Sequence, residues 1–396
     1  MKKVLFITTR NILNTSGELR LIKNRAEAMY NQWGVETDYI VFATEKKSAS
    51  AILNNIKGDM TIFSLNILKP LTLYNQIIKF KNLVIKILKS NDYQCVILSG
   101  IGTLSLVNTI KKYNKNIPVI ADIHGADEDI KEFAKNKKIS KKVFLHSLYN
   151  YSKISELKNL KKMDGIFVVT QALAKYLSKA YSLKAPNYYI VPCALNTKEI
   201  DSAAQIEYRK KYRKKYSVSS DEKLFVYSGG VSPWQCIEES IDLFNRLNNL
   251  NAGKYKMLIL SHHLKEIIPL IKNSPNIITD SVESHEVNKI LCAGDYGFLL
   301  REDIITNNVA FPNKFLEYVQ SGMKIITTPY VYDIAEKVVE LEIGIIIGFE
   351  KDNVSKLDKF IKSNKQFENW GKRKKVLDST SFETTLADFI QDYKLN

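Results

Sequence analysis

Hydrophobic residues along the chain fall into short apolar runs separated by longer amphipathic stretches. Short runs rich in Val, Ile and Phe are typical of strands that are buried on both faces of a sheet. Between them, apolar residues recur every three or four positions, which is typical of helices with one buried side. In the first half, the predicted helix 18–33 accompanies predicted strands at residues 4–8, 37–42, 60–63, 95–98, 119–122 and 166–169.

A second alternation follows a polar crossover at residues 191–201. Its predicted strands are residues 224–227, 257–260, 277–279, 296–300 and 324–327. Such alternation favours parallel sheets with helices on both faces, so the predicted fold class is α/β, with two Rossmann-like, doubly wound domains facing each other across a cleft. We place the domains at residues 1–193 and 194–379. Ligands of such sheets bind outside the carboxyl ends of the strands.

Length and composition agree with this organisation. The 396 residues suffice for two domains, and the 45% hydrophobic content is that of a globular protein. The apolar runs are shorter than the roughly 20 residues that cross a bilayer. The cysteines have no paired spacing, which favours buried thiols in a reducing cytosol over disulfides or a zinc site; they are Cys95, Cys193, Cys236 and Cys292. The expected location is cytoplasmic.

A net charge of +16 suits an anionic partner. The densest basic segment is YRKKYRKKY, residues 208–216. On a helix, Tyr208, Tyr212 and Tyr216 share one face, which is found in helices on membrane surfaces and equally in helices packed on a core. Both interpretations remain open for this segment. Because no nucleic-acid-binding motif accompanies the charge, we expect an anionic membrane surface, with peripheral attachment to its inner face, ahead of nucleic acid.

The most informative segment is AGDYGFLLREDIITNNVAFPNKFLEYVQSGMKII, residues 293–326. A predicted strand is followed by polar residues, a helix and a glycine stop. Proline is favoured at the first position of a helix, where its missing N–H needs no partner. Free N–H groups and cations suit a phosphate, and a carboxylate suits a sugar hydroxyl. The residues that combine these groups are Arg301, Glu302, Pro312, Asn313, Lys314 and Glu317. A nucleotide-sugar carries both a phosphate and hydroxyls.

This segment resembles the donor-binding motif of the family 4 glycosyltransferases, which are retaining enzymes with the GT-B fold. Their motif has two glutamates separated by seven residues, and Glu317 matches the second. The first falls on Val309, so the resemblance implies that Glu302 or Asn308 contacts the hydroxyl instead. The neighbouring sequence is similar to a subgroup that builds bacterial surface polysaccharides. The resemblance also implies that a C-terminal helix, residues 380–396, packs back on the first domain.

The same resemblance assigns other residues. His124 follows a predicted strand and looks like the histidine that faces the donor sugar, while Gly17 ends a loop of the kind that lies beside donor and acceptor. Ser228, Gly229 and Gly230 follow the first strand of the second half. The family's arginine and lysine that hold the diphosphate would fall on Gly230 and Gln235. Since both cations are missing, we expect Arg301 and Lys314 to replace them.

The predicted function is therefore retaining transfer of a sugar from a nucleotide-sugar, with UDP as the expected nucleotide, to a glycan, teichoic-acid or lipid-linked acceptor. In this hypothesis His124, Glu302, Arg301 and Lys314 act in catalysis. No cofactor and no metal is expected: Asp127, Glu128 and Asp129 spell a metal-binding pattern of another fold, but they suit a helix start here. The alternatives are an inverting transferase or epimerase, and a non-catalytic basic adaptor.

Overall fold

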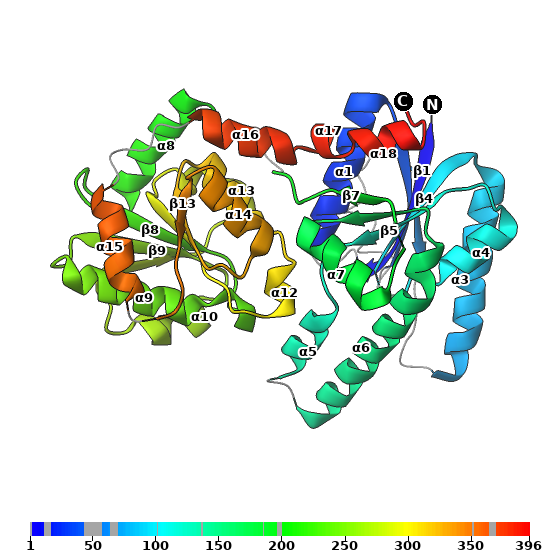
Figure 1. Ribbon diagram of the computed structural model, residues 1–396, viewed down its shortest axis with the longest axis horizontal. Helices are drawn as coiled ribbons and strands as arrows, with labels where there is room; N and C mark the ends of the chain where they lie inside the picture. The colour runs from blue at the N-terminus through cyan, green and yellow to red at the C-terminus, as the bar shows by residue number, and fades with distance from the viewer. Residues whose placement is uncertain are drawn as a thin grey trace. The chain divides into compact units, whose positions relative to one another are not determined.

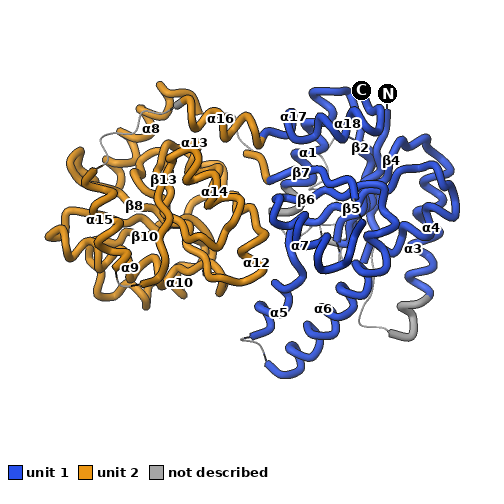
Figure 2. The backbone as a smooth tube through the Cα atoms, in the orientation of Figure 1, with its two compact units in different colours: residues 1–192, 381–396 blue, residues 193–380 orange. Residues whose placement is uncertain are grey.

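A computed structural model describes residues 2–11, 17–42, 58–63, 70–100, 102–135, 138–184, 186–195, 200–350, 352–363 and 370–396. The chain forms two compact units, each with its own sheet and core (Figures 1 and 2). Unit 1 comprises residues 1–192 and 381–396, and unit 2 comprises residues 193–380. Each unit is described by itself below.

Unit 1 contains a parallel sheet of seven strands. In spatial order the strands are β3 (Met60–Phe63), β2 (Glu36–Phe42), β1 (Lys3–Asn11), β4 (Tyr93–Ser99), β5 (Val119–Ile123), β6 (Gly165–Val168) and β7 (Tyr188–Ile190). The central strands are fully buried because helices cover both faces of the sheet (Figure 1). The helices are α1 (Gly17–Trp33), α3 (Pro70–Ser90), α4 (Leu106–Tyr113), α5 (Glu128–Ala134), α6 (Ile139–Asn159), η1 (Leu160–Lys162) and α7 (Gln171–Tyr181).

Unit 2 contains a parallel sheet of six strands. Their order is β10 (Ile277–Asp280), β9 (Tyr255–Leu260), β8 (Lys223–Ser228), β11 (Tyr296–Leu299), β12 (Lys324–Thr327) and β13 (Gly344–Ile346). The helices before and among them are α8 (Ser202–Lys215), η2 (Pro233–Gln235), α9 (Ile237–Leu250), α10 (Leu264–Ile267), η3 (Ile268–Ile271), α11 (Ser284–Leu291), α12 (Ile305–Asn308), α13 (Asn313–Gln320) and α14 (Tyr332–Glu340). After β13 come α15 (Asn353–Ser363) and α16 (Trp370–Thr380).

The C-terminal residues return to unit 1 as two short helices, α17 (Phe382–Thr385) and α18 (Ala387–Asp392). Phe389 is fully buried and packs edge-on against Phe167 of β6 at 4.8 Å between ring centroids. Tyr189 of β7 lies 5.7 Å from the same ring and donates a hydrogen bond to Asp392 at 2.7 Å. The chain end therefore completes the core beside β6 and β7.

Three of the cysteines are buried and Cys193 is half-buried, and all four are free thiols. Within the described part of the chain, no helix has the length and apolar character needed to span a bilayer. In both units the strands run in parallel, so their carboxyl ends meet at one edge of each sheet. These two edges are where ligands are expected to bind.

Candidate functional site

The candidate site of unit 2 lies at the carboxyl edge of its sheet. β8 ends at Ser228 and β11 ends at Leu299. The segment after β8 contacts the segment after β11 and the first turn of α13 through hydrogen bonds to Gln235. The residues predicted from positions 293–326 therefore lie beside the glycine turn that follows β8.

The side chain of Lys314 reaches from α13 to the end of β8. Its Nζ donates to Oε1 of Gln235 at 2.7 Å and lies 4.1 Å from the centre of the Tyr227 ring. Gly229 has a φ of +137°, and a Cβ built on it would lie 2.4 Å from Cε of Lys314. A residue with a side chain would therefore strain the turn and displace the lysine.

Arg301 is the second cation at this edge, and it is buried. Its Nη1 donates to the carbonyl oxygens of Leu300 at 2.9 Å and Gln235 at 3.4 Å. The hydroxyl of Thr328 accepts from the Arg301 N–H at 3.1 Å and donates to its carbonyl at 2.7 Å. Burial lowers the pKa of the guanidinium, although arginine keeps its charge in proteins. These hydrogen bonds fix the Arg301 guanidinium in a buried position at the carboxyl edge of the sheet.

Electrostatics at this edge favour an anion. Burial and the neighbouring Arg301 hold the pKa of the Lys314 ammonium well below its ordinary value of 10.5, while Glu317 opposes that shift. Two cations that share a partly desolvated site repel each other, and a bound anion would relieve the repulsion. The arrangement can therefore bind a phosphate group.

The sequence did not predict that Gln235 and Tyr227 belong to this cluster. The Tyr227 hydroxyl donates to the carbonyl of Gly230 at 2.6 Å and to Oε1 of Gln235 at 3.2 Å. Gln235 therefore connects both cations to the end of β8. A buried tyrosine at the end of a strand, followed by two glycines and a glutamine, is a weak signal, because neither side chain is charged.

The backbone after β8 is partly engaged within the protein. The Ser228 N–H donates to the Tyr318 hydroxyl at 3.0 Å, and the Gly229 N–H donates to the carbonyl of Leu260 at 2.9 Å. These two N–H groups already have partners. The turn contributes to the site sterically, because Gly229 has no side chain and so leaves room for Lys314.

The polar residues after β11 differ in their freedom. Glu302 is exposed, whereas the amide of Asn308 donates to Oδ1 of Asp303 and to the carbonyl of Tyr330, both at 3.1 Å. Val309, which stands where the family motif has its first glutamate, is buried. The carboxylate of Glu302 is thus more accessible to a ligand than the amide of Asn308.

α13 begins at Asn313, so Pro312 caps the helix from the residue before it instead of forming its first turn. The Pro312 carbonyl accepts from the Phe315 N–H at 3.0 Å. Asn313 is exposed and Glu317 is half-buried. Lys314 and Glu317 are one turn apart on the helix, as the spacing predicts.

In unit 1, His124 follows β5 at the carboxyl edge of the sheet. Its Nε2 lies 2.7 Å from Oδ2 of Asp122, whose Oδ1 pairs with Arg25 of α1 at 2.5 Å. Arg25 also donates to the carbonyl of Val191 at 2.6 Å. Burial alone would raise the pKa of Asp122, but Arg25 and His124 hold it well below its usual range. The sequence suggested neither Arg25 nor Asp122, although a carboxylate within a buried strand implies a cationic partner.

The remaining glycine of the prediction, Gly17, is the first residue of α1. The loop before it, residues 12–16, lies outside the described residues. Gly125, beside His124, has open space where a Cβ would stand. Glu128 begins α5, with Asp127 as its cap residue. Within the described ranges, no group of three or more His, Cys, Asp or Glu side chains is arranged to hold a metal ion.

The basic helix α8 packs on unit 2 through the face that carries its tyrosines. Tyr212 and Tyr216 are buried, and Arg213 donates to the carbonyl of Ala293 at 3.2 Å. Arg209 and Arg213 both pair with Asp295, at 2.5 and 3.2 Å. The core therefore covers Tyr212 and Tyr216, which contradicts a membrane-facing role for these two, while Tyr208 is half-buried.

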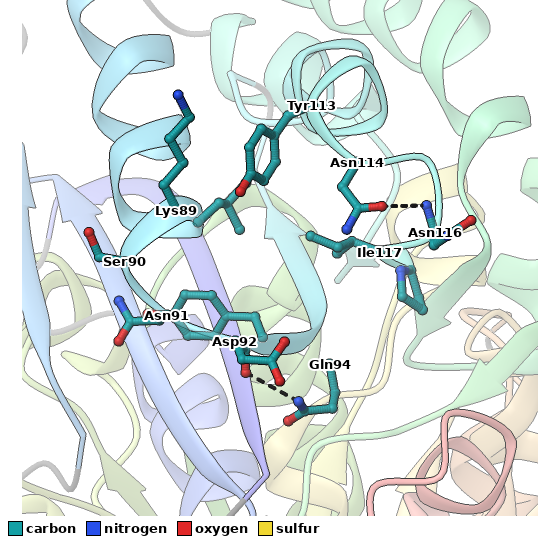
Figure 3. A pocket seen from close by; sticks show the side chains of 12 residues that line it. Lys89, Ser90, Asn91, Asp92, Gln94, Tyr113, Asn114, Asn116 and Ile117 are labelled. Carbon is teal, nitrogen blue, oxygen red and sulfur yellow. Dashed lines mark hydrogen bonds between the residues drawn. The ribbon is translucent and has the colours of Figure 1, made fainter.

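The surface of each unit has a hollow beside its sheet. In unit 1, a hollow of about 600 Å³ between the starts of β4 and β5 is lined by Asn91, Gln94 and Tyr113 (Figure 3). It lies at the amino edge, away from His124. In unit 2, a hollow of about 280 Å³ is lined by residues of α9, among them Glu238, and by residues after β11 and β13, among them Leu300 and Phe349. It therefore adjoins the edge that carries Arg301.

Comparison with known proteins gives a family match for part of the chain. Residues 23–199 match the model of the family Glycosyltransferase Family 4. This range lies almost wholly in unit 1 and includes Arg25, Asp122 and His124. A search of curated proteins found no match.

Solved structures share the fold over the whole chain. A glycosyltransferase from Rickettsia africae has a TM-score of 0.72 at 15% identity, covering 99% of this chain and 98% of that one. Anabaena HepE in complex with UDP-glucose has a TM-score of 0.62 at 11% identity, covering 100% and 96%. WaaG, a glycosyltransferase involved in lipopolysaccharide biosynthesis, has 0.62 at 12%, covering 99% and 97%. The predicted GT-B fold is confirmed.

Proposed function

We propose a donor and a reaction for this chain, a glycosyltransferase whose residues 23–199 belong to Glycosyltransferase Family 4. The donor is a UDP-sugar, and its diphosphate binds at the carboxyl edge of the sheet of unit 2. The observation that carries this proposal is the position of the Lys314 ammonium, 2.7 Å from Gln235 and against Gly229. HepE, with the same fold, was solved with UDP-glucose.

In this proposal Lys314 contacts the diphosphate, and Arg301 acts through its charge from beneath. Departure of the nucleoside diphosphate leaves negative charge on the phosphate oxygens in the transition state. Cations that are already in place lower that barrier without reorganising, and one well-placed donor contributes about 3 kcal/mol. The N–H groups at the start of α13, from Asn313 onward, favour the same charge.

In this proposal, carboxylates accept hydrogen bonds from the hydroxyl groups of the donor. Glu317, half-buried one turn after Lys314, accepts from the ribose. Of the two residues expected to replace the missing first glutamate, we favour Glu302, because the Asn308 amide is engaged with Asp303 and Tyr330. In unit 1, His124 is the proposed contact for the transferred sugar, with Asp122 fixing its ring.

Transfer proceeds in this proposal with retention of configuration, by attack on the same face that the leaving group departs from. The acceptor is a bacterial surface glycan, a teichoic acid or a lipid-linked sugar. WaaG, with the same fold, acts in lipopolysaccharide biosynthesis. An anionic membrane surface is a further proposed partner, which suits the net charge of +16.

Calorimetry with UDP tests the diphosphate site. Lys314→Ala should weaken UDP binding and reduce transfer by about a hundredfold or more, because the half-buried cation is lost. Lys272→Ala removes an exposed lysine of the same unit and should change neither quantity. Equal UDP affinity of the wild type and a folded Lys314→Ala protein would contradict the site. The anomeric configuration of the product, read by NMR, separately tests retention.

A further inference from the structure

The helix α6 is polar where it is buried and apolar where it is exposed. Its fully buried residues are Ser152, Ser155, Glu156 and Asn159. Large apolar side chains point outward instead, at 81% exposure for Ile139, 61% for Val143, 57% for Phe144, 51% for Tyr151, 51% for Ile154 and 50% for Leu157. Figure 1 shows α5 and α6 extending away from the sheet of unit 1. This is the reverse of an ordinary surface helix.

Hydrogen bonds explain why the polar side faces inward. Asn159 donates to the carbonyl of Ser155 at 2.8 Å and accepts from Asn108 of α4 at 3.1 Å. Glu156 accepts from the Tyr181 hydroxyl of α7. The polar face is therefore satisfied by its neighbours, and the apolar face is left toward solvent. Large apolar side chains exposed together along one helix indicate an interaction surface.

The charges around the patch are predominantly positive. Exposed lysines flank it on α5, on α6 and at their cap positions, namely Lys131, Lys135, Lys138, Lys141, Lys142 and Lys158. Carboxylates are fewer: Asp129 is the exposed one on α5, whereas Glu132 and Glu156 are buried and Glu128 pairs with Lys153 at 3.0 Å. The outer face of the helix thus combines apolar side chains with unbalanced positive charge.

We propose that this outer face of α6 lies on an anionic lipid surface, with the apolar side chains among the acyl chains and the lysines at the headgroups. A second copy of the chain would bring lysines against lysines, which is unfavourable. Nucleic acid would engage the lysines but would leave the apolar residues exposed. An anionic bilayer satisfies both features. This inference rests on the membrane partner in the proposed function and names the surface that meets it.

Co-sedimentation of the full chain with vesicles tests the proposal. The wild type should bind vesicles of phosphatidylcholine with phosphatidylglycerol, and bind phosphatidylcholine alone more weakly. Ile139→Ser, Val143→Ser and Phe144→Ser together should reduce binding by about tenfold or more. Lys138→Glu, Lys141→Glu and Lys142→Glu together should do the same, since each lysine near an anionic surface contributes about 1 kcal/mol.

The matched control reverses three exposed lysines on α8, Lys210, Lys211 and Lys214, and so changes the net charge equally. It should keep most of the vesicle binding. Equal losses in the α6 and α8 charge variants would overturn the proposal in favour of general electrostatic attraction. If the wild-type protein does not bind anionic vesicles, both the proposed role of α6 and the proposed membrane partner are overturned. Unchanged UDP binding by all variants would show that the donor site is separate from either result.

Discussion

Lys314 is the central residue of the proposed diphosphate site. The ammonium lies between Gln235, the Tyr227 ring and Gly229, next to a buried arginine. Its pKa is lowered mainly by burial, and then by Arg301. An anion bound beside it would reverse that shift, because it favours the charged form.

Proton uptake on ligand binding follows from this environment. Above the lowered pKa of Lys314, UDP should bind together with one proton, so its affinity should fall as pH rises through that pKa, at a pH below 10.5. Calorimetry in buffers of different ionisation enthalpy measures the uptake, at a pH above the phosphate pKa of about 6. The Lys314→Met protein should take up no proton. Identical uptake in both proteins would contradict the assignment.

Glu156 is a second buried residue with a strongly shifted pKa. Burial and then the neighbouring Asp127 raise its pKa to about 8. The folded protein therefore keeps a proton that the unfolded chain releases above about pH 4.5. The stabilisation is complete below the unfolded-state pKa and is lost as pH rises through about 8.

The melting temperature of unit 1 should consequently fall by several degrees between pH 5 and pH 8. Glu156→Gln, which stays neutral, should flatten that dependence. Glu383→Gln changes an exposed glutamate of the same unit and should leave the slope unchanged. A wild-type slope in the Glu156→Gln protein would show that other groups cause it.

Residues that act through distant partners were the hardest to predict. Lys314 and Glu317 are neighbours on one helix, so their spacing alone brings them together. Asp122 and Arg25 are far apart in sequence, and their pairing depends on how α1 packs against β5. Gln235 is uncharged and ends the three-residue helix η2, so no periodicity or charge pattern marks it.

At the scale of elements, α8 shows that a basic helix can be structural. Arg213 is buried and bonds to the carbonyls of Ala293 at 3.2 Å and Glu222 at 2.7 Å, and to Asp295 at 3.2 Å. Its guanidinium therefore joins α8 to the start of β8 and to the residues before β11. Exposed lysines on the same helix make no comparable set of contacts among the described residues.

Arg213→Ala should lower the free energy of unfolding of unit 2 by about 3 kcal/mol, because Asp295 and several carbonyls would lose a buried partner. The adjacent Lys214→Ala should change it by less than about 0.5 kcal/mol. Urea denaturation measures both. Similar midpoints for the two variants would contradict a structural role for the Arg213 contacts.

Elements with a clear hydrophobic pattern were predicted well. The helix predicted at residues 18–33 is α1, Gly17–Trp33, and the strand predicted at residues 60–63 is β3. Two strands of three residues each, β7 and β13, were missed, because each is too short to show a pattern. The last helix was predicted as continuous, whereas Leu386 separates α17 from α18.

At the scale of the whole molecule, the fold class was predictable because both halves repeat one physical pattern. Buried strands alternate with amphipathic helices, and that pattern leads to the two parallel sheets of the GT-B fold. The C-terminal return to unit 1 has no such local signal. It was inferred from family resemblance, and the contacts of Phe389 now supply its physical basis.

Phe389→Ala tests how much the returning segment stabilises unit 1. The ring is fully buried against Phe167 and Tyr189, so its loss should cost about 3–5 kcal/mol. Asp388→Ala, an exposed neighbour, should have little effect. Thermal unfolding of both proteins measures the difference. An unchanged transition in Phe389→Ala would show that the returning segment does not stabilise unit 1.

The central claim is that a diphosphate binds beside Lys314 at the carboxyl edge of the unit 2 sheet. A crystal structure of the UDP complex measures this most directly. We predict phosphate oxygens within hydrogen-bonding distance of Nζ of Lys314, next to Gly229 and the start of α13. A diphosphate bound at any other place, with Lys314 still held by Gln235, would contradict the claim.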